Sequence, residues 1–112
     1  MSEATVTISY NDFKKMELVV GLVTSVQPHP NADKLYLITV NLGTEERQLV
    51  AGLKPYYTAE ELNGKYIVVL ANLEPRPVRG VMSQGMLLAA QAGDQVVIIS
   101  PERPLTPGAK VL

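Results

Sequence analysis

The sequence has 112 residues, a length that suits one domain with a single core, and contains no cysteine, which excludes a disulfide framework, a zinc ribbon and a thiol nucleophile. Ten Lys and Arg against eleven Asp and Glu give a formal net charge of −1. This balance excludes attraction of a nucleic acid by the field of the whole molecule, so such a partner would have to be held by a local patch.

The first predicted elements are a short helix and a bent strand. Residues 9–16 begin with side chains that cap helices, and they predict a short helical segment. Residues 18–26 are rich in β-forming residues and contain Gly21, a residue type that often marks a bulge or a bend within a strand. Pro28 and Pro30 cannot donate to a strand ladder, so we expect this strand to end there in a loop.

A hairpin is predicted next. In "LYLITVNL", residues 35–42, every second residue beginning with the tyrosine is apolar or aromatic, which is typical of a strand with one buried face. Gly43 and Thr44 then turn the chain into a third strand at 47–51. The two strands should therefore pair as a hairpin.

The second half of the chain predicts a short helix and three more strands. Thr58 and Glu61 have the spacing of a capping box, and Asn63-Gly64 gives a stop signal, so the helix has one or two turns. The later strands are "KYIVVLA" at 65–71, "GMLLAA" at 85–90 and "VVIIS" at 96–100. An extended C-terminal tail is predicted by Pro101, Pro104 and Pro107.

The five short strands within residues 18–90, a helix between the third and the fourth, and a bent first strand favour an all-β fold, a small five-stranded Greek-key barrel of the OB type. The barrel would span about residues 18–90 of a single domain, 1–112, with a short N-terminal extension and a C-terminal extension over 91–112. In such barrels the loops after the first and the fourth strand flank the ligand face. Those loops are residues 27–34 and 72–82, so we expect the binding site there.

One stretch on that face is unlike ordinary core or loop: "PRPVRGVMSQGMLLAA", residues 75–90, places two arginines, a hydroxyl, an amide and a flexible thioether among glycines. From about residue 12 to residue 110 the chain resembles the structure-specific tRNA-binding domain. The resemblance is carried by this stretch, with Ser83-Gln84-Gly85-Met86 inside it, and by Asp33-Lys34-Leu35, Asn72-Leu73 and the closing "PGAKV". That domain occurs as a free-standing small protein, as a C-terminal appendage or beta subunit of methionyl-tRNA synthetase, and in metazoan synthetase cofactors. The resemblance implies an OB barrel that grips the elbow of folded tRNA without reading an anticodon.

The residues that match the family's RNA-contacting pattern are Lys34, Asn72, Arg76, Arg79, Ser83, Gln84 and Met86. Their chemistry agrees with this role, because arginine offers planar donors to phosphates and a face for stacking, lysine a point charge, and Ser, Asn and Gln reach 2′-hydroxyls or base edges. Methionine can pack against an unstacked base. The chain departs from the family in carrying Pro77 where many relatives have a basic residue, and in lacking the lysine-rich arm of metazoan members. We therefore expect a dissociation constant weaker than about 1 μM at physiological salt.

Each candidate also has a structural interpretation. Arg76 and Arg79 could be solvated loop charges, and Met86 could belong to the core. Ser83 and Gln84 could satisfy backbone groups beside the neighbouring glycines. The sequence leaves these alternatives open.

Metal binding and catalysis are not expected. Lys34 could pair with Asp33 or Glu45 on the surface. His29, the only histidine, has no cysteine or second histidine with which to form a metal site, so we expect it to act as a strap that holds its own loop in place. No G-x-S-x-G motif and no HIGH or KMSKS signature of a class I synthetase occurs. We therefore expect a non-catalytic protein without a cofactor, which supplies a synthetase with general affinity for tRNA. A chaperone-like peptide binder, as in an export-associated relative of the same fold, is the alternative.

The location and the assembly state are further expectations. The chain has no basic region followed by an apolar run at its start and no eighteen consecutive apolar residues, so we expect a cytoplasmic protein without a membrane partner. Residues 96–100 form an apolar run without alternation, and such a strand needs cover on both faces. With "TVTISY" at 5–10 it would leave an apolar patch, which predicts a homodimer, as in free-standing members of the family. The alternative is that 5–10 covers 96–99 within one chain.

Overall fold

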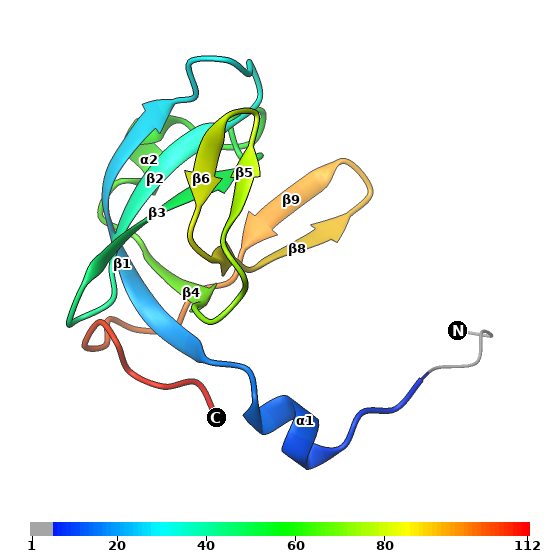
Figure 1. Cartoon of the computed structure of the whole chain (residues 1–112). Helices are drawn as coiled ribbons and strands as arrows, with labels where there is room; N and C mark the ends of the chain where they lie inside the picture. Colours follow the sequence, from blue (N-terminus) through cyan, green and yellow to red (C-terminus); the bar gives the residue numbers. More distant parts are fainter. Residues whose placement is uncertain (1–5) are drawn as a thin grey trace.

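The computed structural model describes residues 6–112. These residues form a β-barrel whose wall contains one long, curved strand (Figure 1). Within these residues the elements are α1 (Tyr10–Lys14), β1 (Leu18–Pro28), β2 (Tyr36–Asn41), β3 (Glu46–Ala51), α2 (Ala59–Leu62), β4 (Tyr66–Leu70), β5 (Arg76–Val78), β6 (Val81–Ser83), β7 (Met86–Leu87), β8 (Ala89–Ala92) and β9 (Gln95–Ile98). The main sheet is antiparallel, in the order β3-β2-β1-β4-β7. The Gln84 N–H donates to the Gln48 carbonyl at 2.9 Å and nearly closes the barrel. The predicted five-stranded OB-type barrel is confirmed.

The curvature of β1 allows this strand to pair on both sides. Its first half pairs with β4 and its second half with β2, and the two ladders meet at Leu22. A bulge interrupts the register between Val23 and Ser25, three residues beyond the expected position at Gly21. Gly21 is instead required by packing, because a Cβ at this position would lie 2.5 Å from Cγ2 of Val40. The bend was predicted, but its cause was placed at the wrong residue.

Both predicted helices are present, and their caps are those expected. The Ser9 hydroxyl accepts from the Asp12 N–H at 3.0 Å, at the start of α1. At α2, the Thr58 hydroxyl accepts from the Glu61 N–H at 3.1 Å, and the Glu61 carboxylate accepts from the Thr58 N–H at 2.7 Å. These reciprocal bonds satisfy backbone donors that a helix start leaves unpaired. α2 buries Leu62 completely and thereby adds to the core.

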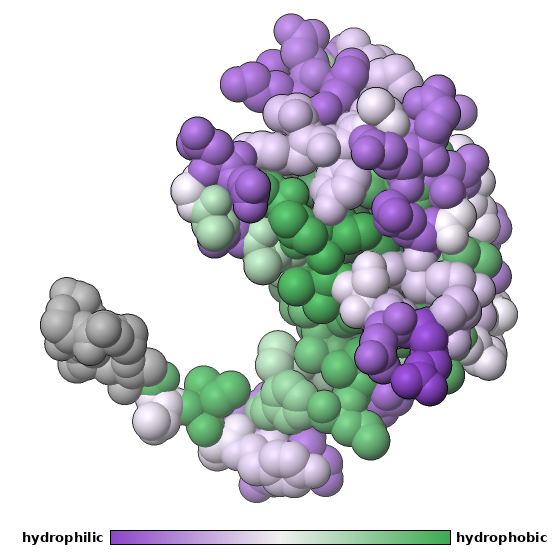
Figure 2. Space-filling view, turned by 180° about the vertical axis from the view of Figure 1, so that it is seen from behind, coloured by the Kyte–Doolittle hydropathy of each residue, from purple (hydrophilic) through white to green (hydrophobic). Residues whose placement is uncertain are grey.

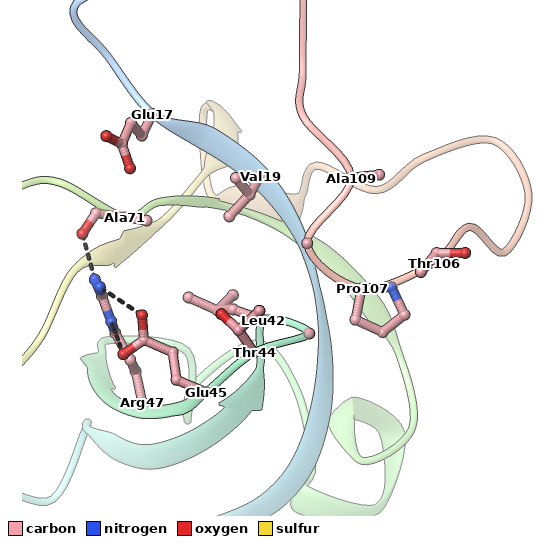
Figure 3. A pocket seen from close by; sticks show the side chains of 12 residues that line it. Glu17, Val19, Leu42, Thr44, Glu45, Arg47, Ala71, Thr106, Pro107 and Ala109 are labelled. Atoms are coloured by element: carbon pink, nitrogen blue, oxygen red, sulfur yellow. Dashed lines mark hydrogen bonds and ion pairs between the residues drawn. The ribbon is translucent and has the colours of Figure 1, made fainter.

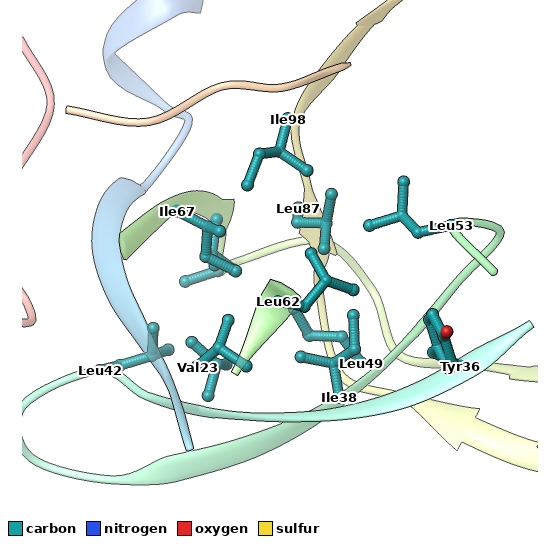
Figure 4. Packing of buried hydrophobic residues seen from close by; sticks show 13 residues of the cluster. Val23, Tyr36, Ile38, Leu42, Leu49, Leu53, Leu62, Ile67, Leu87 and Ile98 are labelled. Atoms are coloured by element: carbon teal, nitrogen blue, oxygen red, sulfur yellow. The ribbon is translucent and has the colours of Figure 1, made fainter. Parts of the chain in front are cut away.

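The core fills the barrel interior (Figure 4). The buried cluster consists of Val23, Tyr36, Ile38, Val40, Leu42, Leu49, Leu53, Leu62, Ile67, Val69, Ala71, Leu87 and Ile98. β2 contributes alternate residues to it, as its sequence pattern predicted. Within residues 6–112 no helix is long and apolar enough to cross a membrane.

Two expectations about the second half were wrong. The expected loop 72–82 contains the β5–β6 hairpin, and the expected strand at 85–90 is divided between β7 and β8. β8 pairs with β9 in a second hairpin that projects from the barrel (Figure 1). The chain changes partners at Leu88, whose N–H donates to the Val68 carbonyl while its carbonyl accepts from Ile99. An apolar run gives no sign of such a division.

The C-terminal tail lies along the first half of β1. The Gly108 N–H donates to the Val20 carbonyl at 2.7 Å, and the Val20 N–H donates to the Ala109 carbonyl at 2.8 Å. The Val111 N–H donates to the Leu18 carbonyl at 2.8 Å. The tail therefore pairs with the side of β1 that faces away from β4, and the expectation of an extended tail is confirmed.

Candidate nucleic-acid interface

The β5–β6 hairpin carries both candidate arginines to the surface. Arg76 begins β5, and Arg79 forms the two-residue turn with Gly80; both arginines are exposed. Their turn has φ values of 53° at Arg79 and 89° at Gly80, and a type I′ hairpin turn requires positive values at both positions. Arg79 is the one non-glycine residue with positive φ in the described part of the chain. Conformations of this kind cluster at functional sites, which favours a role for Arg79 beyond the turn.

Three of the candidates meet at an open cavity of about 400 Å³ between the hairpin and the start of β7. Arg76, Ser83 and Met86 line it. Its other lining residues are Val50, Leu73, Glu74, Val78 and Gly85. Met86 and Leu73 are 46% and 38% exposed, so the thioether of Met86 and the isobutyl group of Leu73 are within reach of a partner. An apolar floor beside a guanidinium suits an unstacked base and its phosphate.

Asn72 and Gln84 line an adjoining depression, which shares Leu73 and Glu74 with the cavity. Asn72 is engaged by the segment before β1: its Oδ1 accepts from the Glu17 N–H at 2.9 Å, and its Nδ2 donates to the Lys15 carbonyl at 2.6 Å. Asn72 therefore fixes the position of the loop that leads from β4 into the hairpin.

Ser83 and Gln84 bind the backbone of β3. The buried Ser83 hydroxyl accepts from the Val50 N–H and donates to the Gly85 carbonyl, each at 3.0 Å. The Gln84 Oε1 accepts from the Gln48 N–H at 3.2 Å. The structural interpretation left open by the sequence thus holds for both side chains, although the exposed Gln84 keeps an NH₂ group that donates to no group within residues 6–112.

The remaining candidates stand on two loops. Lys34 is exposed in the β1–β2 loop and takes part in none of the ion pairs formed within residues 6–112, so the alternative of a pair with Asp33 or Glu45 is not seen there. Neither Lys34 nor Arg79 lines the cavity. His29 straps the β1–β2 loop to the hairpin, as predicted, because its Nε2 lies 3.0 Å from the Val78 carbonyl oxygen.

Arg47 is a site residue that the sequence did not reveal. Its Nε and Nη2 donate to the Glu45 carboxylate at 3.2 and 3.0 Å, and its Nη1 donates to the Ala71 carbonyl (Figure 3). The hydrogen bond and then the charge of Arg47 lower the pKa of Glu45. These bonds occupy the guanidinium, so Arg47 joins β3 to the end of β4 instead of offering a free cation. The sequence could not indicate this bond, because the Ala71 carbonyl is 24 residues away along the chain and is brought to Arg47 only by the fold.

A larger cavity of about 470 Å³ shares Glu45 and Arg47 with the depression that Asn72 and Gln84 line, and it extends to the C-terminal tail (Figure 3). Glu17 and Glu45 place two carboxylates in its wall, and Arg47 is the one cationic side chain that lines it. Two carboxylates against one paired guanidinium repel phosphates. The exposed hairpin is therefore the better candidate for binding an anionic partner.

Comparison with known proteins identifies the family of this chain. Residues 18–110 match the family described as "Putative tRNA binding domain". The chain is 54% identical over 104 residues to a methionine–tRNA ligase of Pyrococcus horikoshii, and 47% identical to that of Thermotoga maritima. Each alignment covers 93% of this chain but only 14% and 16% of the ligases, so the chain spans about one seventh of their length.

Two solved structures extend the comparison. A MetRS-related protein of Pyrococcus horikoshii matches with a TM-score of 0.90 and 34% identity, over 96% of this chain and all of that chain. The CsaA chaperone of Picrophilus torridus matches with a TM-score of 0.87 and 28% identity, over 95% of this chain and all of that chain. The family match covers residues 18–110, most of the chain, so this chain belongs to the tRNA-binding domain family.

Proposed function

We propose that the chain recognises the outer corner, or elbow, of folded tRNA by shape and without reading the anticodon. The observation that carries this proposal is the placement of Arg76 and Arg79 on one exposed hairpin beside an apolar cavity. Shape recognition of RNA depends on backbone contacts and on unstacked loop bases, and the exposed arginines and the apolar floor suit these two kinds of contact.

The candidates divide by role in this proposal. Arg76, Arg79 and Lys34 contact phosphates, Met86 packs under an unstacked base, and the free NH₂ group of Gln84 reaches a 2′-hydroxyl or a base edge. Asn72 and Ser83 hold the site in place through hydrogen bonds from their side chains to backbone groups. Because the cations are few, we expect a dissociation constant weaker than about 1 μM at physiological salt.

Competition experiments test shape recognition. Several tRNAs with unrelated anticodons should displace a labelled tRNA at similar concentrations, while a linear RNA of equal length should not. A transcript with an intact anticodon stem but with D- and T-loops altered so that the elbow cannot form is the matched control, and it should compete as poorly as the linear RNA. Discrimination among tRNAs by anticodon would contradict the proposal.

We further propose that the chain is a non-catalytic, cytoplasmic accessory of methionyl-tRNA synthetase. The support is its similarity to one segment of several methionine–tRNA ligases and to a MetRS-related protein. Added to a synthetase that lacks such a segment, it should lower the KM for tRNA and leave the KM for methionine unchanged.

The similarity to CsaA chaperones favours peptide binding as a second candidate. An unfolded polypeptide that displaces tRNA from the chain would support that candidate.

A homodimer is the assembly that we propose. β9 turns Val96 and Ile98 toward the core, while Val97 and Ile99 are 53% and 40% exposed on its other side. Figure 2 shows hydrophobic residues gathered in the hollow between the β8–β9 hairpin and α1. Of the N-terminal segment that could cover them, residues 6–9 form no strand and are exposed, and residue 5 lies outside the described residues. The outer face of β9 is thus available to a second copy.

Sedimentation equilibrium tests the dimer. The wild-type chain should have about twice its mass of 12.2 kDa at micromolar concentration, and Val97→Asp should reduce it to one chain without unfolding. Val97 is chosen because its side chain is exposed, whereas Ile98 belongs to the core. Thr44→Asp, at an exposed position in the turn between β2 and β3, is the control and should remain dimeric. A wild-type mass of one chain would contradict the dimer.

A further inference from the structure

His29 is the buried polar residue that the proposed binding role does not use. It lies in the β1–β2 loop with an exposed fraction of 5%, and Ser83 is the other buried polar residue among those described. A side chain that is so well buried cannot contact RNA itself. Any effect of His29 on binding must act through the groups that its ring holds.

The two ring nitrogens have different partners, and these define one form of the ring. Nδ1 lies 2.9 Å from the Asn31 backbone N–H, which can only donate, so Nδ1 is the unprotonated nitrogen. Nε2 lies 3.0 Å from the Val78 carbonyl oxygen, which can only accept, so Nε2 carries the proton. The geometry therefore requires the neutral ring in its Nε2–H tautomer.

These partners belong to the two loops that carry the candidate cations. Val78 lies between Arg76 and Arg79, and Asn31 precedes Lys34 in the β1–β2 loop. A second bond joins the same loops, because the Arg79 Nη2 donates to the Asn31 carbonyl at 3.4 Å. The hairpin is not hydrogen-bonded into the main ladder as a strand. Near its base the Ser83 hydroxyl accepts from the Val50 N–H, and near its tip the hairpin is bound to the β1–β2 loop through His29 and Arg79.

We propose that His29 is a positioning residue for tRNA binding: its neutral ring fastens the hairpin tip to the β1–β2 loop and so sets the arrangement of Arg76, Arg79 and Lys34. This inference rests on the proposed function of the hairpin. Without the strap, the arginines have to be ordered when RNA binds, and this ordering lowers the affinity. A glutamine can replace the ring, because its amide offers one acceptor and one donor on the same carbon atom.

Affinity measurements on three variants test the proposal. His29→Ala should weaken tRNA binding about tenfold, the equivalent of roughly one hydrogen bond, and His29→Gln should restore most of the loss. Ile67→Val, in the core on β4, is the control for general destabilisation. It should lower the melting temperature and leave the affinity unchanged. A loss of affinity in Ile67→Val as large as that in His29→Ala would overturn the proposal.

A double-mutant cycle separates this inference from the proposed function. If His29 acts through the arginines, His29→Ala should have little further effect in an Arg76→Ala/Arg79→Ala background, measured at low salt. Full additivity would refute the positioning role while leaving the hairpin as the binding site. If the arginine variant alone binds tRNA as well as the wild type, the proposed site itself is wrong.

The tautomer can be observed directly, even if His29→Ala does not fold. Imidazole ¹⁵N spectra of the wild-type chain at neutral pH should show a protonated Nε2 and an unprotonated Nδ1. A ring with its proton on Nδ1, or one that exchanges rapidly between tautomers, would contradict the strap.

Discussion

Arg76→Ala/Arg79→Ala is expected to weaken tRNA binding roughly 100-fold at physiological salt, about 3 kcal/mol, and to reduce the slope of log affinity against log salt by about two. Each arginine that contacts a phosphate displaces condensed counterions, so its removal takes about one unit from the slope. The single variants, and Lys34→Ala, should each change the slope by roughly one. Filter binding over a range of salt concentrations gives both quantities.

Two controls make this result specific. Arg103→Ala removes an exposed arginine that pairs with Glu102 in the C-terminal segment, and it should leave the slope unchanged. Arg79→Asn removes the charge but supplies a residue that tolerates positive φ, so the affinity should fall while the melting temperature is maintained or raised. Unchanged slopes for Arg76, Arg79 and Lys34 variants alike would place the binding site elsewhere.

Gly21→Ala is expected to produce a large loss of stability, although it adds only one methyl group. The added Cβ would lie 2.5 Å from Cγ2 of Val40 and 3.0 Å from Cδ2 of Leu42, and Val40 is completely buried. Overpacking of this kind costs about 1–3 kcal/mol, because neighbouring side chains must leave their rotamers or the strands must separate. Urea denaturation should show the reduced free energy of unfolding, with a melting temperature lower by roughly 10 °C.

A second substitution tests the cause of this loss. In a Val40→Ala background the space around the new methyl group is available, so Gly21→Ala should cost about 1–2 kcal/mol less than it does in the wild type. Gly52→Ala is the matched glycine control, because its Cβ would meet only Leu35 Cδ2, at an ordinary distance of 3.7 Å. It should change stability little. Equal costs of Gly21→Ala in both backgrounds would exclude the contact with Val40 as the reason.

The elements that could be predicted from the sequence are those with a local cause. The capping box of α2 depends on Thr58 and Glu61, three residues apart, and the alternation in β2 is visible within one strand. The β5–β6 hairpin was missed because Pro75, Pro77 and Gly80 together indicate a loop. Its turn also requires Arg79 in a conformation that sequence propensity assigns to glycine or asparagine.

The candidate site was predictable in its chemistry but not in its geometry. The motif residues lie on or beside the expected face, and the exposure of Arg76 and Met86 agrees with binding, which itself remains a prediction. The sequence could not indicate that Asn72 binds the backbone 55 residues away, or that Leu73 forms part of the cavity floor. Such partners depend on tertiary contacts between segments far apart in the chain.

The C-terminal tail has a consequence for the behaviour of the protein at high concentration. By binding the backbone groups of Leu18 and Val20, it occupies a stretch of β1 that would otherwise be an open strand edge and a template for aggregation. The register is fixed where Gly108 packs against the Leu42 carbonyl, a contact so close that a Cβ would lie 2.6 Å from the oxygen atom. The tail thus covers this strand edge within the same chain, and we expect a protease cut in the preceding proline-rich segment to leave β1 open to pairing with another molecule.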